Sequence, residues 1–323
     1  MRWKSVWHTH GWLITIFIVI IIVSTVVAPG SLSLQGISAM SVYAVEIGLI
    51  AFGEMWVILS GGGGIDLSVG SMYALSQVVL GVLVLHHMTL AVSVALALLA
   101  GLMMGMVNGL IVTVTGIPAI IVTLATMYAY SGLALVLTQG VDISPFPASF
   151  NFIGQSQIMG LPFQLIAIYV PIALLMALVL GRTSYGWNLQ LVGSNPIAAR
   201  FSGISVTRTR IIAYATAGLL SAIAGIIDAS RLVTARPDAG GTANLTAITI
   251  AVLGGTQLQG GEGSILGTVV ATFAITWLSY SFGLANINSI YEEGAVGFVL
   301  LLTLLFQHQN FRARLFNRQK IVP

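Results

Sequence analysis

The feature that most constrains this chain is a series of long apolar stretches that follow one another with only short polar breaks. A backbone in lipid has no water to satisfy its hydrogen bonds, so an apolar stretch of about 20 residues must form a helix. Ten such stretches occur, at roughly 11–29, 39–60, 66–86, 89–113, 117–138, 163–182, 209–232, 244–259, 264–283 and 289–308. The sequence therefore predicts an all-α polytopic membrane protein with about ten transmembrane helices. Glycines interrupt the stretches at 66–86 and 244–259.

Composition excludes several classes of protein. Only 7% of the 323 residues are charged, whereas soluble domains carry about a quarter. The chain has no cysteine, so disulfides and cysteine-based metal sites are excluded. It also lacks the phosphate-binding motif of an ATPase. The histidines form no ligand cluster, and no Ser/His/Asp arrangement is visible. We therefore expect neither catalysis nor a metal or cofactor in this chain. No linker divides it, so 1–323 is predicted to be a single transmembrane domain.

The first stretch has a second interpretation. Arg2 and Lys4 precede it, and Val26-Val27-Ala28 loosely matches a signal-peptide cleavage site. The apolar run is long for a signal peptide, however, so we predict a retained helix.

The basic residues test the number of crossings, because cytoplasmic loops carry an excess of Lys and Arg. With ten helices and the N-terminus inside, ten of the 12 basic residues fall on the inner side. These are Arg2, Lys4, Arg182, Arg200, Arg208, Arg210, Arg312, Arg314, Arg318 and Lys320. Arg231 and Arg236 fall outside. We therefore predict that the N-terminus and a tail at 309–323 are both cytoplasmic.

A polar segment at about 183–208 joins two apolar stretches on this inner side. Asn195 can cap a helix, Pro196 suits a first helical turn, and Gly203 can end the helix. Ala198 and Ala199 favour helix between them. We predict a short surface helix here. Because the chain has no ATPase motif, we expect a force from another chain to enter at this helix. A longer outer loop, at about 139–162, either covers an opening or is a plain surface loop.

Two glycine-rich breaks resemble each other, Gly61–Gly70 and Gly260–Gly267. Glycine-interrupted segments in two halves of a membrane protein indicate a transport site. Asp66 is predicted to cap the helix that follows the first break, with Ser68 one turn inside it. The segment either lines a solute pathway or is a simple capped helix start.

Further polar groups lie within the predicted helices. Glu46 and Glu54 are about 80° apart around one helix, and intramembrane carboxyls usually face a cavity or a partner. Neither has a cation nearby in sequence. Asn108 and Thr123 either bind a hydroxylated solute or hold helices together. The same alternatives apply to Thr126, Tyr128 and Gln139. Asp228 and Arg231, three residues apart, are predicted to pair. Arg236, Asp238, Glu292 and Glu293 are predicted to form an outer rim.

Several spaced motifs, between about residues 40 and 305, resemble the membrane permease subunits of ribose-type ABC sugar importers. They are Gly63–Ser71, Asn108–Val112, Pro118 with Val122–Thr126, Gly132–Thr138, Gly193–Ile204, Leu253–Thr256 and Gly260–Gly267. The resemblance implies a ten-helix permease like those of type II ABC importers, in the bacterial inner membrane. It also implies a second permease copy or a paralogue, cytoplasmic ATPase subunits that bind ATP and magnesium, and a periplasmic or extracellular sugar-binding protein. No nucleic acid is expected.

The resemblance also assigns a role to the inner segment. In the family, the loop that matches Gly193–Ile204 forms a coupling helix that docks on the ATPase. This assigns ATPase coupling to Gly193, Asn195, Ala198, Ala199, Arg200 and Gly203. The chain departs from the family pattern in its four consecutive glycines, in Glu54, in Ser194 and in Ser131. The extra acid and the longer glycine break would alter the pathway or the solute, and none of the departures changes the predicted fold.

We therefore predict the permease subunit of an ATP-driven importer of a monosaccharide or similar hydroxylated solute. The predicted pathway residues are Glu46, Glu54, Asp66, Ser68, Asn108 and Thr123. An alternative is an ion- or proton-coupled secondary carrier that uses Glu46 or Glu54. A membrane scaffold is a third interpretation, which the interrupted helices disfavour.

Overall fold

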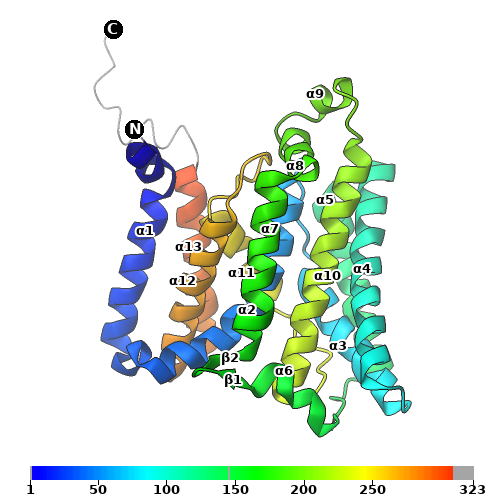
Figure 1. Ribbon diagram of the computed structural model, residues 1–323, viewed down its shortest axis with the longest axis vertical. Helices are drawn as coiled ribbons and strands as arrows, with labels where there is room; N and C mark the ends of the chain where they lie inside the picture. Colours follow the sequence, from blue (N-terminus) through cyan, green and yellow to red (C-terminus); the bar gives the residue numbers. More distant parts are fainter. Residues whose placement is uncertain (1, 145, 308–323) are drawn as a thin grey trace.

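The computed structural model describes residues 2–144 and 146–307, with side chains described within residues 15–305. The long helices lie along the longest axis of the molecule (Figure 1). In chain order the helices are α1 (Arg2–Val27), η1 (Pro29–Leu32), α2 (Leu34–Leu59), α3 (Val69–Leu85), α4 (Leu90–Thr115), α5 (Ala119–Thr138), η2 (Ala148–Phe150), α6 (Asn151–Gln155), η3 (Leu165–Tyr169), α7 (Val170–Arg182), α8 (Ser184–Ser194), α9 (Pro196–Phe201), α10 (Val206–Leu232), α11 (Ala243–Leu253), α12 (Ile265–Leu284) and α13 (Ser289–Gln307). The predicted tail at 309–323, with its four basic residues and the neighbouring His308, lies outside the described residues.

Each of the ten predicted stretches overlaps a helix: α1 to α5, η3 with α7, and α10 to α13. Six helices in the described residues are long and apolar enough to cross a membrane, namely α2, α4, α5, η3 with α7, α10 and α12. The two glycine-interrupted stretches are shorter, since α3 has 17 residues and α11 has 11. The chain is therefore a mostly helical, multi-pass membrane protein. The number of ten crossings stays a prediction.

Serine side chains set where three of the long helices begin. Ser33 Oγ accepts a hydrogen bond from Gly36 N at the start of α2, at 3.0 Å. Ser205 does the same for Arg208 N in α10, and Ser264 for Gly267 N in α12. Each contact satisfies one of the backbone N–H groups that a helix start leaves without a partner. The polar breaks between apolar stretches therefore fix the register of the helices that follow them.

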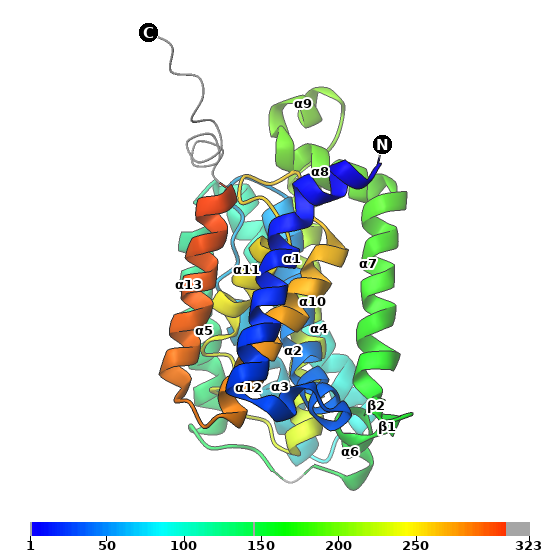
Figure 2. The same cartoon turned by 90° about the vertical axis from the view of Figure 1, so that its left-hand side faces the viewer.

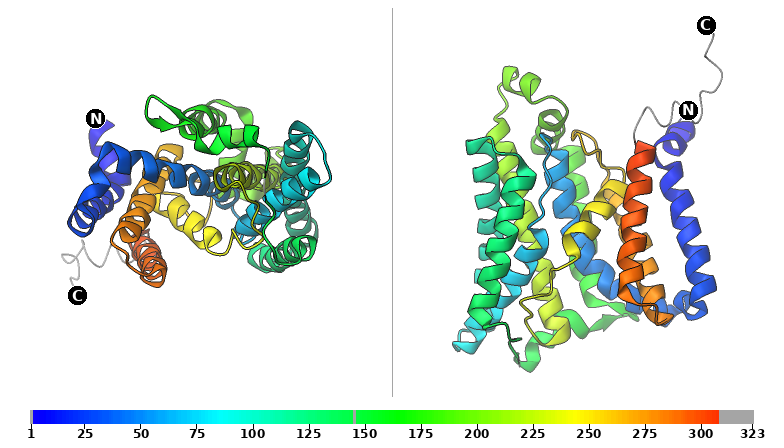
Figure 3. Two further views of the ribbon diagram at one scale, coloured as in Figure 1. Left: turned by 90° about the horizontal axis from the view of Figure 1, so that it is seen from below. Right: turned by 180° about the vertical axis from the view of Figure 1, so that it is seen from behind.

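Helix α2 is the central helix, and 83% of its most apolar window is buried. In the view from below, α4 and α5 lie at one end of an elongated outline and α1 at the other (Figure 3). Close backbone packing joins α4 to α10, because a Cβ added at Gly101 or Gly105 would run into the backbone of α10. Such small-residue seams are typical of helices that associate in lipid.

The two ends of the molecule differ in structure. Helices α8 and α9 project at one end, where α1 begins and α13 ends (Figure 2). At the opposite end lie α6 and a short hairpin. Its strands β1 (Gln157–Ile158) and β2 (Leu161–Pro162) pair antiparallel, with Gln157 opposite Pro162. The predicted outer loop is therefore partly ordered as η2, α6 and this hairpin. An isolated bridge from Ile143 to Ala235 ties it to the segment after α10.

Candidate functional site

The short helix predicted on the inner segment is present as α9. Asn195 caps it, because its Oδ1 accepts hydrogen bonds from Ile197 N at 3.1 Å and Ala198 N at 2.9 Å. Gly203, at φ 78°, follows the helix in the left-handed region, as predicted for a helix end. The helix thus begins and ends where the sequence indicated.

The two faces of α9 have different chemistry. Ala199 is fully buried and packs with Val192 and Val206, so this residue anchors α9 to the rest of the chain. Ile197 and Phe201 are 66% and 90% exposed, and Arg200 is also exposed. An exposed Ile and Phe beside a cation form an apolar surface that a partner protein can cover.

Helix α8 joins α9 to the body of the molecule. Tyr185 OH donates to Thr209 O of α10 at 3.2 Å. Burial raises the pKa of the Tyr185 phenol, so the group stays protonated and keeps donating. At the other end of α8, a Cβ added to Gly193 would collide with Leu59 O and Gly261 N. Gly61 in turn faces the backbone of Gly193.

This close approach brings three segments together, which we call the glycine junction: Gly61, Gly193 and the pair Gly260–Gly261. Gly261 N donates to Leu59 O at 3.0 Å, which joins the second glycine break to the end of α2. Arg210 Nε donates to Ser60 O at 3.2 Å beside it. The two glycine-rich breaks that resemble each other in sequence therefore both touch the helix that leads to α9.

Five of the six predicted pathway residues lie in one buried network. Ser68 Oγ donates to Asp66 Oδ1 at 2.6 Å, and Asn108 Nδ2 donates to Ser68 Oγ at 2.7 Å. Asp66 N donates to Glu54 Oε1 at 3.1 Å. Thr123 Oγ1 donates to Ile65 O at 3.1 Å, next to Asp66. None of these five side chains is exposed, and their hydrogen bonds hold α2, α4 and α5 around the first glycine break.

The prediction for the start of α3 needs a correction. The Asp66 carboxylate accepts a backbone hydrogen bond, but from Ser68 N, at 2.9 Å. Helix α3 begins at Val69, so Ser68 precedes the helix and does not lie one turn inside it. Gly61, Gly62 and Gly63 have φ values of 72°, 71° and 70°, so the chain turns in this break and the helix starts later than the hydropathy suggested.

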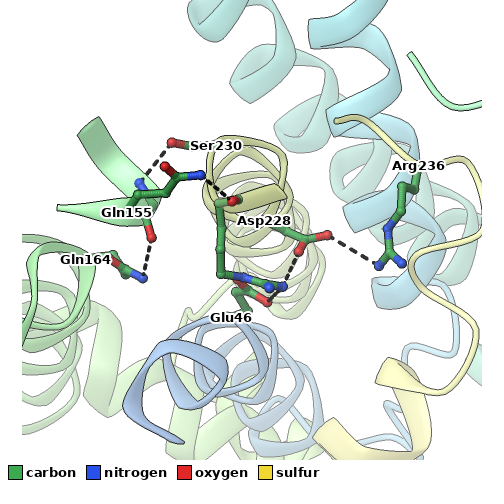
Figure 4. Close-up of polar contacts among 8 residues, drawn as sticks. Glu46, Gln155, Gln164, Asp228, Ser230 and Arg236 are labelled. Carbon is green, nitrogen blue, oxygen red and sulfur yellow. Dashed lines mark hydrogen bonds and ion pairs between the residues drawn. The ribbon is translucent and has the colours of Figure 1, made fainter. Parts of the chain in front are cut away.

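The sixth residue, Glu46, belongs to a separate ion cluster with Asp228 and Arg236 (Figure 4). Asp228 lies near the end of α10 that is remote from α9. Arg231 Nε donates to Glu46 Oε1 at 2.7 Å, and Arg231 Nη2 donates to Glu46 Oε2 at 3.1 Å. Arg231 also pairs with Asp228, as predicted, and Arg236 lies 3.8 Å from Asp228. The absence of a cation near Glu46 in the sequence was misleading, since its partner is on α10.

The same end of the molecule contains a cavity of about 540 Å³. Residues of α2, α3, α11, α12 and α13 line it, among them Glu46, Tyr43, Thr246, Thr276 and Glu292. This volume lies within the range of about 300–1,000 Å³ that is usual for small-molecule sites. Glu46 is the only predicted pathway residue in its wall, so the cavity and the buried network are different places.

Comparison with known proteins identifies the family. Residues 36–305 match the model of the family described as branched-chain amino acid transport system / permease component. The ribose import permease protein RbsC of Bacillus subtilis (strain 168) is 37% identical over 311 residues, which are 96% of this chain and 95% of RbsC.

A second group of relatives extends the match. The autoinducer 2 import system permease protein LsrD of Yersinia enterocolitica is 35% identical over 80% of this chain and 79% of its own. LsrD of Escherichia coli (strain K12) is 32% identical over 92% of each chain. The chain belongs to this permease family. No solved structure matches it.

Sequence reasoning missed three features of this permease. The exposure of Ile197 and Phe201 depends on how α9 docks on α8. Tyr130 OH donates to Asn108 Oδ1 at 3.2 Å and so extends the buried network. Arg231 reaches Glu46 across 185 residues of sequence. The only early signal was the rarity of ionisable groups in apolar stretches, which made Glu46 and Arg231 candidates for a pair.

Proposed function

We propose that this chain is the permease subunit of an ATP-driven importer that moves a monosaccharide or similar small hydroxylated solute inward. One observation carries the proposal: the similarity to a ribose import permease extends over 96% of this chain. The LsrD relatives, named for autoinducer 2 import, support the same kind of transporter. Hydrolysis of ATP belongs to a separate cytoplasmic chain, so this subunit is not itself an enzyme.

In this proposal α9 is the coupling helix. Ile197 and Phe201 would sit in a groove of the ATPase, with Arg200 at the edge, while Ala199 holds the helix onto α8 and α10. Asn195, Ala198 and Gly203 shape its two ends. Closure of two ATPase subunits would move α9, and the glycine junction would pass the motion to the segments after α2 and before α12. The solute would then be released by a population shift between outward- and inward-open states.

The proposal also includes an arrangement in the membrane. Ten crossings place α9, the start of α1 and the end of α13 on the cytoplasmic side, and the cavity at the outer end. A second copy or a paralogous permease completes the membrane part. A sugar-binding protein delivers the solute to the outer end, where the segment at 139–162 and the predicted rim lie.

Exposed residues of α9 allow a direct test. We expect Phe201→Glu and Ile197→Glu to abolish co-purification of the ATPase subunit, because each places a charge in an apolar contact. Met159→Glu is the control, since Met159 is 99% exposed at the opposite end. All three variants should reach the membrane in normal amounts. Retention of the ATPase by both α9 variants would refute the coupling assignment.

The secondary-carrier alternative is not favoured by the comparisons. The contacts of the two carboxylates also argue against it. Glu46 accepts a hydrogen bond from Arg231 and Glu54 accepts one from Asp66 N, so both carboxylates have partners within the protein. Uptake in proteoliposomes separates the two mechanisms. Uptake by the importer requires the ATPase subunit, with ATP on the side of the ATPase, and an uncoupler does not affect it. Uptake by a secondary carrier needs no ATP and is abolished by an uncoupler.

A further inference from the structure

The cavity at the end away from α9 has walls that are rich in hydrogen-bond acceptors. Thr246 Oγ1 donates its proton to Thr242 O at 3.1 Å, and Thr276 Oγ1 donates to Thr272 O at 2.8 Å. Because the single proton of each hydroxyl is donated to a backbone carbonyl, the two threonine oxygens can act only as hydrogen-bond acceptors for a bound molecule. Glu46 and Glu292 add carboxylate oxygens. A ligand that fits these walls has to bring donors.

Cations are missing from the same walls. Among the described lining residues there is no Lys, Arg or His. The Arg231 guanidinium, which lies over the ring of the lining residue Tyr43, is turned to Glu46 and Asp228 through its Nε and Nη2 atoms. Arg236 faces Asp228 as well. The ion cluster of Glu46, Asp228, Arg231 and Arg236 contains two carboxylates and two guanidinium groups, so it is close to neutral. Glu292 therefore gives the cavity an excess of negative charge. An anion would meet oxygen atoms without a compensating charge.

Aromatic residues complete the cavity. Tyr43 and Tyr280 line it on two different helices, and the Tyr43 ring also lies 4.9 Å from the Arg231 guanidinium carbon. Tyrosine rings provide apolar faces together with a hydroxyl that donates or accepts. The C–H faces and hydroxyl groups of a sugar match such a lining.

We propose that this cavity is a selectivity site of the permease itself. It holds hydroxyl groups of an uncharged solute through Glu46, Thr246 and Thr276, and it rejects carboxylates and phosphates of similar size. The inference rests on the proposed importer function and adds to it a filter inside the membrane subunit. The sugar-binding protein would select the solute first, and the cavity would select it again after delivery to the outer end.

The lack of native cysteine makes the charge of the cavity measurable in the purified permease. Ser279→Cys and Thr242→Cys place a thiol in the wall. Met159→Cys is the control, since Met159 is 99% exposed in the hairpin and lies outside the cavity. The reaction rates of two thiol reagents of similar size are compared, one carrying a quaternary ammonium and the other a sulfonate.

We expect both cavity thiols to prefer the ammonium reagent, by about tenfold more than the control, because a cleft lined by one sign of charge concentrates the opposite ion. Glu292→Gln should reduce this preference, and Glu46→Gln should shift it toward the sulfonate, since Arg231 then loses a carboxylate. An equal ratio at cavity and control positions, or a preference for the sulfonate, would overturn the inference. If one cavity variant fails to fold, the other gives the result.

Transport then separates the inference from the proposed function. With the complete transporter in proteoliposomes, unlabelled ribose should compete with labelled ribose, whereas ribose with a carboxylate in place of its terminal hydroxymethyl group should not. If the cavity thiols show the charge preference but no ATP-driven uptake occurs, the importer function is refuted and the charge selectivity of the cavity is retained. If uptake occurs but the carboxylate competes equally, or the thiols show no charge preference, the selectivity site is refuted and the importer function is retained.

Discussion

Ser68 and Ser76 are two fully buried serines eight residues apart, and they differ in their partners. Ser68 Oγ donates to Asp66 and accepts from Asn108, whereas Ser76 Oγ has no partner among the described residues. We expect Ser68→Ala to lower the free energy of unfolding by about 1.5–3 kcal/mol, because it breaks a hydrogen bond to a buried carboxylate. Ser76→Ala should be neutral or slightly stabilising, since it removes an unsatisfied group.

Thermal unfolding of the two purified variants in one detergent measures this difference. Their equal size and burial make Ser76→Ala the control for the loss of a hydroxyl as such. Equal shifts in Tm for the two variants would show that the network around Asp66 does not stabilise the fold.

At this scale, sequence reasoning succeeded where partners are local. Asp228 and Arg231 are one helical turn apart, and their pairing follows from helix geometry alone. Glu46 and Arg231 meet only because α2 and α10 pack together, and no local pattern contains that contact. The burial of Glu54 and Asp66 has the same origin. A polar residue in an apolar stretch either faces a cavity or finds a partner, and only the packing decides between the two.

At the scale of elements, the glycine junction connects α8 to both glycine-rich breaks. Gly193→Ala adds a methyl group where Leu59 O and Gly261 N already lie. We expect it to lower the free energy of unfolding by about 1–3 kcal/mol, as overpacking does, and to impair ATP-driven uptake. Gly181→Ala on neighbouring α7 is the matched control, because nothing lies within 4 Å of its added Cβ.

The control variant should gain about 0.5–1 kcal/mol, because alanine favours helix over glycine. Thermal unfolding and uptake in proteoliposomes measure both effects. A Gly193→Ala permease with unchanged Tm and uptake would mean that the backbone contact at the junction is not required.

Element boundaries were predictable where the polar breaks contain helix caps, as at Asn195 and Gly203. They were less predictable where glycine changes the path of the chain. The apolar run at 244–259 ends as a helix at Leu253, since glycines follow and the segment turns toward the junction. The hydropathy of a segment indicates whether it can lie in lipid, but it does not indicate where the helix within that segment ends.

At the scale of the whole molecule, the arginines are divided between the two ends in the way that the sequence predicted. The end of α7, α9 and the start of α10 contain Arg182, Arg200, Arg208 and Arg210, whereas Arg231 lies in the last turn of α10 and Arg236 follows it. The two ends of α10 lie toward opposite ends of the molecule (Figure 1). The sequence predicted this separation because positive charge collects on the cytoplasmic side. The elongated outline could not be predicted, since it depends on which helices pack against one another.

The orientation that follows from this charge separation is testable with two single cysteines in a chain that has none. Phe201 and Met159 are 90% and 99% exposed at opposite ends, so both thiols are accessible without disturbing the packing. A membrane-impermeant thiol reagent should label Met159→Cys in right-side-out vesicles and Phe201→Cys in inside-out vesicles. Detergent should make both reactive, which controls for folding. The reverse labelling would place α9 outside, and an ATPase in the cytoplasm could then not reach it.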